Sequence, residues 1–122
     1  MRSRVAIIED DPAIGPMLSE ILSLEGFDTT VINNGRKAAG VLRSGGYDAA
    51  LLDVMLPGKD GIAILRELRS ADATKDLPVV MLTAKVDDTT TWEGWRAGAN
   101  YFVQKPFEPD ALVRVLRSLI GF

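Results

Sequence analysis

Acidic side chains directly follow two apolar segments that have the length of β-strands. The acidic run 9–11 comes after residues 5–8, and Asp53 comes after residues 49–52. The carboxyl ends of the strands in an open parallel sheet form its binding crevice, so we expect these carboxylates on one edge. Two carboxylates 4 Å apart repel by roughly 4 kcal/mol at an effective dielectric of 20 unless a cation joins them. The pattern therefore predicts a site for a divalent cation.

Two more apolar segments end in polar groups of other kinds. Residues 79–82 lead to Thr83, and residues 101–104 lead to Lys105. A hydroxyl and an ammonium group beside metal-binding carboxylates suit a phosphoryl group, whose oxygens accept hydrogen bonds and carry negative charge. The sequence thus predicts phosphoryl chemistry at this edge of the sheet.

Three of the carboxylates have separate roles in this interpretation. Asp53 stands alone at the end of a middle strand and is the best candidate for a nucleophile that forms an acyl phosphate. Asp10 and Asp11 are a pair suited, together with Asp53, to bind a magnesium ion (Mg²⁺). Taken singly, Asp11 is equally well explained as a helix N-cap, and Asp53 as a turn residue at a strand end.

The composition excludes several other kinds of site. The chain has 122 residues, enough for one domain with its own core, and it contains no cysteine and no histidine. Disulfides, thiol chemistry, catalytic triads and imidazole metal sites are therefore excluded, and the metal ligands must be oxygens.

Charge and hydropathy limit the kinds of partner and the cellular location that we expect. The net charge is −3 and the basic residues are scattered, so we expect no direct nucleic-acid binding by this chain. No apolar run approaches the roughly 20 residues that span a bilayer, and the amino terminus lacks the pattern of a secretory signal. We expect a cytoplasmic protein that does not enter a membrane.

Strand-like and helix-like periodicities alternate along the chain. We expect helices between and after five strands at 5–8, 29–32, 48–53, 79–82 and 101–104. Strict alternation predicts an α/β fold with a parallel sheet and helices on both sides. The periodicity leaves a Rossmann-like and a flavodoxin-like strand order open.

Local signals place some helix boundaries and surface residues. Asp11-Pro12 indicates an N-cap followed by proline at the first helical position, and Gly26 is suited to a left-handed helix stop. Trp92 and Trp95 are three residues apart on an expected helix at 88–97, so they share one face. We consider Trp95 the better candidate for an exposed interface residue and assign Trp92 equally well to the core.

Motifs along the whole of residues 1–122 share the order and spacing of one known family. These motifs are Ile7-Ile8-Glu9-Asp10-Asp11, Tyr47-Asp48, residues 52–58, Asp60-Gly61, residues 78–84, Gly98-Ala99 and Lys105-Pro106-Phe107. With them the chain resembles the receiver domain of two-component response regulators, of the chemotaxis-regulator-like kind. The resemblance implies a flavodoxin-like, doubly wound (βα)5 fold whose five-stranded parallel sheet has the order 2-1-3-4-5.

The resemblance also implies a function for the carboxylates. Asp53 would accept a phosphoryl group from a sensor histidine kinase or a histidine phosphotransfer protein. Asp10, Asp11, Asp53 and the backbone carbonyl of Met55 would hold Mg²⁺. The domain would be a regulatory phosphoacceptor with self-phosphotransfer and autodephosphorylation only, not a turnover enzyme.

The remaining predicted site residues would read out the phosphoryl group. Lys105 would pair with it, held by a cis bond to Pro106, and Thr83 would donate its hydroxyl to it. Phe102 would then turn inward and change the surface of the fourth helix, fifth strand and fifth helix, where Tyr101 is a candidate interface residue. This surface would control a downstream protein or a fused effector domain, or form a phosphorylation-dependent dimer.

Three alternatives stay open at this point. A phosphatase of the haloacid-dehalogenase type also uses a strand-end aspartate, but it needs a second aspartate two residues later, where Met55 stands. A phosphorylation-independent interaction domain would predict a degraded pocket, whereas all the expected residues are present. The chain could also be the receiver part of a larger transcription factor or enzyme.

Overall fold

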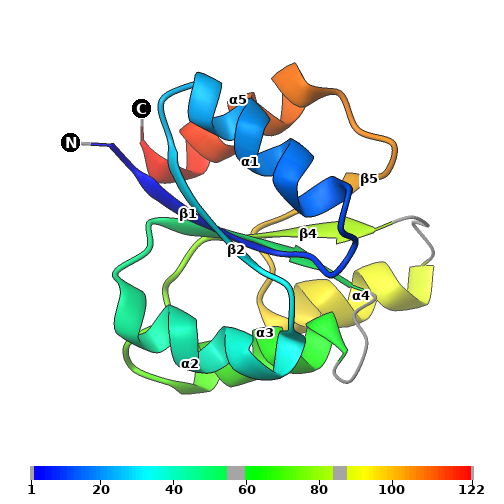
Figure 1. Ribbon diagram of the computed structural model, residues 1–122. Helices are drawn as coiled ribbons and strands as arrows, with labels where there is room; N and C mark the ends of the chain where they lie inside the picture. Colours follow the sequence, from blue (N-terminus) through cyan, green and yellow to red (C-terminus); the bar gives the residue numbers. More distant parts are fainter. Residues whose placement is uncertain (1, 55–59, 84–87, 122) are drawn as a thin grey trace.

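Strands and helices alternate in the computed structural model, which describes residues 2–54, 60–83 and 88–121 (Figure 1). In chain order the elements are β1 (Arg4–Ile8), α1 (Ile14–Leu24), β2 (Asp28–Ile32), α2 (Gly35–Gly45), β3 (Ala49–Asp53), α3 (Gly61–Ser70), β4 (Val79–Thr83), α4 (Asp88–Ala97), β5 (Tyr101–Gln104) and α5 (Pro109–Ile120). Within the described residues, no helix combines the length and the apolar composition that crossing a bilayer requires.

The five strands form one parallel sheet with the order β2-β1-β3-β4-β5. Helices α1 and α5 cover one face, and α2, α3 and α4 cover the other (Figure 1). This arrangement confirms the predicted α/β fold and the strand order that the resemblance implied. Because the strand order reverses between β1 and β3, the carboxyl ends of these two strands border the crevice of the sheet.

The central strands are buried on both faces. Every residue of β3 and β4 is buried. Alternate side chains enter different halves of the core: Ile7 and Leu51 pack with α1 and α5, whereas Ile8 and Leu52 pack with α2, α3 and α4. Two-sided burial explains the continuous apolar runs in the sequence. It also decides where the residues after each strand point, since side chains two positions apart share a face.

Helix α1 begins at Ile14, two residues later than the Asp11-Pro12 signal predicts. Asp11 nevertheless caps this end, because its Oδ1 accepts hydrogen bonds from the N–H groups of Ala13 at 2.8 Å and Ile14 at 3.3 Å. At the other end, Gly26 has a φ of 95°, in the left-handed conformation expected of a helix stop.

Candidate metal and phosphoryl site

The ladder between β1 and β3 brings Glu9 and Asp53 together. Ile8 is aligned with Leu52, so Glu9 and Asp53 are the next residues along the two strands. Since side chains alternate between the faces, both carboxylates continue the row of side chains that faces α1 and α5. The local strand register, rather than any loop, sets their positions.

Lys105 lies between these two carboxylates. It follows β5 two residues after Val103, which also packs on the α1 and α5 side. Its Nζ is 2.9 Å from Asp53 Oδ2 and 3.2 Å from Glu9 Oε2. The exposed side-chain fractions are 17% for Lys105, 8% for Asp53 and 2% for Glu9. Water and salt therefore screen these charges much less than they screen charges on the surface.

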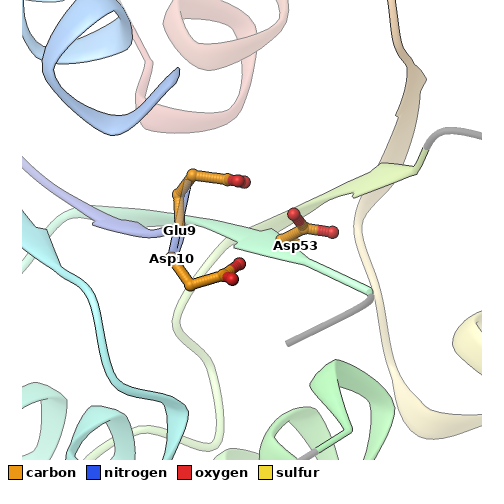
Figure 2. Close-up of side chains that lie close together, drawn as sticks. All are labelled: Glu9, Asp10 and Asp53. Atoms are coloured by element: carbon orange, nitrogen blue, oxygen red, sulfur yellow. The ribbon is translucent and has the colours of Figure 1, made fainter. Parts of the chain in front are cut away.

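Asp10 completes a cluster of three carboxylates. One oxygen from each of Glu9, Asp10 and Asp53 lies within 4.8 Å of the other two. Figure 2 shows the three side chains at the ends of β1 and β3, on the same edge of the sheet. Together with the Lys105 ammonium they leave an excess of negative charge, and oxygen donors are the ligands that Mg²⁺ prefers, so the cluster fits this ion. Met55, the other predicted ligand, lies outside the described residues.

Asp11 does not belong to the cluster, which corrects the predicted metal set of Asp10, Asp11 and Asp53. After Asp10 the chain leaves the sheet for α1, whose first N–H groups have no partner within the helix. The Asp11 carboxylate satisfies two of them, the N-cap role that was the alternative for this residue. Glu9 takes its place beside Asp53, because one residue beyond the aligned pair of Ile8 and Leu52 the two strands reach Glu9 and Asp53.

The electrostatics of the pocket depend on its burial. The pKa of Glu9 is raised from 4.5 to about 7, because burial and, to a smaller extent, the Asp53 carboxylate outweigh the lowering effect of Lys105. Burial alone would lower the pKa of Lys105, but hydrogen bonds and charge from Asp53 and Glu9 hold it above its ordinary value. The lysine therefore stays charged near neutral pH, while Glu9 exchanges its proton in that range. A bound cation would favour the ionised carboxylate.

Thr83 ends β4 beside the pocket. Asp53 is aligned with Leu82, so Thr83 is the next residue along the neighbouring strand, and it is 4% exposed. The Thr83 carbonyl oxygen accepts the backbone N–H of Lys105 at 2.7 Å. The Lys105–Pro106 peptide bond is cis, as the resemblance implied. The structure thus brings all three predicted phosphoryl-site residues, Asp53, Thr83 and Lys105, to one edge.

The predicted switch and interface residues lie around β5 and α4. Phe102 is half-buried, and its ring centroid is 5.3 Å from that of Trp95. Tyr101 and Trp95 are each 47% exposed, whereas Trp92 is 64% exposed. The expectation that Trp95 is the more exposed tryptophan is therefore wrong, because Trp95 packs against Phe102.

Comparison with known proteins identifies the family. Residues 5–117 match the family model of the response regulator receiver domain. The chain belongs to this family. Receiver domains are the regulatory phosphoacceptors of two-component systems, so the family accounts for a buried aspartate beside a lysine and further carboxylates.

Relatives of known sequence are longer than this chain. The DNA-binding response regulator MtrA of Mycolicibacterium smegmatis is 44% identical over 118 residues, which cover 97% of this chain and 50% of that protein. The transcriptional regulatory protein BaeR of Escherichia coli is 33% identical over 117 residues, which cover 96% and 48%. The chain spans about half the length of these curated relatives.

Solved structures of receiver domains share the whole fold. A putative response regulator from Chloroflexus aurantiacus has a TM-score of 0.94 and 33% identity, with 100% of both chains covered. The receiver domain of the sensor histidine kinase PA1611 from Pseudomonas aeruginosa has a TM-score of 0.92 and 29% identity, also with 100% of both chains covered. That crystal structure holds a magnesium ion in its active-site cleft.

Proposed function

We propose that Asp53 accepts a phosphoryl group from a sensor histidine kinase or a histidine phosphotransfer protein in a Mg²⁺-dependent reaction. One observation carries the proposal: the cluster of Glu9, Asp10 and Asp53 carboxylates, with Lys105 Nζ 2.9 Å from Asp53. A buried nucleophile beside a fixed cation and a metal-binding set suits phosphoryl transfer, because catalysis of this reaction is mainly positioning and charge stabilisation.

The chemistry assigns each group a role. An Asp53 carboxylate oxygen attacks phosphorus, the new P–O bond forms as the P–N bond to the donor imidazole breaks, and the electron pair returns to the imidazole nitrogen. The donor histidine lies outside this chain, since residues 1–122 contain no histidine. Lys105 holds Asp53 in place and offers its charge to the transferred group. Bound Mg²⁺, held by Glu9, Asp10, Asp53 and the Met55 carbonyl, would neutralise phosphoryl oxygens.

The output follows from the same edge. We infer that the Thr83 hydroxyl donates to the phosphoryl group and that Phe102 responds, which shifts the populations of the surface formed by α4, β5 and α5. Trp95 and Tyr101 are exposed on these elements, which supports a protein contact there with a downstream target, a fused effector domain or a second copy.

We further infer a cytoplasmic regulatory domain that occupies residues 1–122 and has no turnover activity beyond self-phosphotransfer and autodephosphorylation. The basic residues of this chain are scattered and its net charge is −3, which does not suit DNA binding. If the whole regulator binds DNA, we infer that it does so through a segment that corresponds to the unmatched half of the curated relatives. Hydrolysis of a generic phosphate ester with many turnovers would instead support the phosphatase alternative.

An apolar groove beside the pocket supports a protein as the phosphodonor. It measures about 410 Å³, shares Lys105 with the pocket, and is lined mainly by Ile14, Met17, Ile21, Pro106 and Phe107. A segment that carries the donor histidine would bury this groove as it reaches Asp53. Met17→Glu should therefore slow transfer from a phosphorylated histidine phosphotransfer domain but leave labelling by acetyl phosphate unchanged. Equal slowing with both donors would contradict this placement.

Intact-mass spectrometry tests the proposal. Wild-type protein treated with acetyl phosphate and Mg²⁺ should gain the mass of one phosphoryl group, and Asp53→Asn should gain none. Circular dichroism of Asp53→Asn must show the wild-type fold, which separates loss of the nucleophile from loss of structure. An unchanged yield in folded Asp53→Asn would remove Asp53 from its role.

A further inference from the structure

Phe102 on β5 lies against one turn of α4. β5 is one of the two edge strands of the sheet, and Phe102 packs against the core half formed with α2, α3 and α4. On α4 its ring meets Trp95, with the two centroids 5.3 Å apart and the ring planes tilted by 59°. Tilted aromatic pairs at this separation attract one another beyond the area they bury.

Gly94 is the residue that allows this close approach. It is buried in the middle of α4, where glycine weakens a helix relative to alanine. A Cβ atom at this position would overlap Phe102 Cζ and lie 3.0 and 3.2 Å from Cε2 and Cε1. No side chain at position 94 is compatible with the ring where it lies, so the space above Gly94 belongs to Phe102.

The same ring is close to the phosphoryl edge. Phe102 is aligned with Met81 on β4, and Thr83 is two residues further along that strand. Met81 packs in the same half of the core as Phe102, and side chains two positions apart share a face. The row of Met81 and Thr83 therefore runs on the same face of the sheet as Phe102, so Thr83 lies one step along this row from the residue aligned with the ring.

We propose that Gly94 and Trp95 form a seat for the Phe102 ring and that this seat transmits the switch to α4. Gly94 is then a positioning residue, and the proposal rests on the phosphoacceptor function proposed above. When the ring leaves the seat, Trp95 loses its aromatic partner. Because Trp95 is 47% exposed, this change appears on the outer surface of α4.

The fluorescence of Trp95 can report whether the Phe102 ring occupies its seat. The chain has two tryptophans, and Trp92 is 64% exposed, so Trp92→Phe leaves Trp95 as the single tryptophan, which can be excited selectively, with little structural cost. In this parent protein, Mg²⁺ and beryllofluoride should shift the Trp95 emission. In the parent with Gly94→Ala, the emission should already be shifted without beryllofluoride, and the further response should be less than half that of the parent.

Urea unfolding tests the packing of Phe102 on Gly94 without any phosphoryl mimic. Gly94→Ala should lower the unfolding midpoint when Phe102 is present, because the added methyl group displaces the ring. In a Phe102→Ala background the same substitution should raise the midpoint, since alanine favours a helix and the ring is gone. Gly40→Ala is the matched control: Gly40 is an exposed glycine inside α2 with no atom within 4 Å of an added Cβ, so the midpoint should rise in both backgrounds.

Two results would overturn the proposal: a raised midpoint for Gly94→Ala with Phe102 present, or a full beryllofluoride response of Trp95 in that variant. The reversal of sign between the two backgrounds supports the seat even if Gly94→Ala alone folds poorly. If the parent protein itself does not respond to beryllofluoride, the proposed phosphoacceptor function fails, and the unfolding cycle alone decides whether the seat exists.

Discussion

The ladder between β1 and β3 has polar residues at both ends, and these ends are built in opposite ways. At the amino end, the Arg4 N–H donates to Asp48 Oδ2 at 2.7 Å, and the Asp48 N–H donates to the Arg4 carbonyl oxygen at 2.8 Å. The Arg4 guanidinium donates to the Gly45 carbonyl oxygen and lies 4.5 Å from the centre of the Tyr47 ring. Each of these contacts joins complementary groups.

At the carboxyl end, the same two strands hold like charges. Glu9 and Asp53 are adjacent, Asp10 is within reach of both, and Lys105, which follows β5, supplies the counter-charge. The amino end therefore stabilises the register, whereas the carboxyl end retains repulsion that a cation would relieve. Buried groups with shifted pKa values of this kind concentrate at functional sites.

The largest expected difference between the two ends is in the pH dependence of stability, which the titration of Glu9 should cause at the carboxyl end. Between a pKa of 4.5 in the unfolded chain and about 7 in the folded protein, the folded state binds a proton that the unfolded state does not. The free energy of unfolding without metal should therefore fall as the pH rises through this window. At about 1.4 kcal/mol per pKa unit, the loss is at most about 3.5 kcal/mol.

Urea denaturation in EDTA across this pH range measures the effect. Glu9→Gln should remove most of the decline, because the amide does not titrate. A wild-type profile that stays flat, or a decline of the same size in Glu9→Gln, would contradict the assignment of this repulsion to Glu9.

Removal of a metal ligand should have the next largest effect. Mg²⁺ at a hundredfold excess over its dissociation constant should stabilise the wild-type protein by about 2.7 kcal/mol. Asp10→Ala should lose this stabilisation, because one of the three clustered carboxylates is gone. Thermal unfolding with and without Mg²⁺ gives the measurement.

Asp11→Ala is the matched control for Asp10→Ala. It should lower stability by about 1 kcal/mol through the lost helix cap but keep the full gain from Mg²⁺. If Asp11→Ala loses the Mg²⁺ effect and Asp10→Ala keeps it, the metal set assigned to the carboxyl end is wrong.

The smallest effect is expected at the amino end. Arg4→Ala should lower the free energy of unfolding by about 1 kcal/mol through loss of the guanidinium hydrogen bond and the contact with Tyr47. Phosphorylation by acetyl phosphate should not change. Arg2→Ala is the control, since its ion pair with Asp28 is 3.6 Å long and exposed, and it should have almost no effect. Reduced phosphorylation in folded Arg4→Ala would show that the two ends are not independent.

Much of the site could be predicted because strand ends are visible in the sequence. Asp53, Thr83 and Lys105 each follow an apolar run, and parallel strands deliver such residues to one edge. The alternation of strands and helices likewise predicted the α/β fold. Periodicity does not say which strands are neighbours, so the strand order came from the family resemblance.

The errors come from features that only tertiary contacts decide. All three acids of the run 9–11 satisfy the strand-end pattern, and the register of Ile8 with Leu52 selects Glu9 rather than Asp11 to face Asp53. The exposure of the two tryptophans depends on the rotation of α4 about its axis. That rotation places Trp95 against Phe102, a contact that helix periodicity alone does not specify.

Mapping the modified residue tests the central claim most directly. Wild-type protein is treated with acetyl phosphate, with Mg²⁺ or with EDTA, and borohydride then reduces any acyl phosphate to homoserine before tandem mass spectrometry of the peptides. The account predicts homoserine in place of Asp53, in the Mg²⁺ sample and not in the EDTA sample. Modification at another carboxylate, or equal labelling in EDTA, would contradict it.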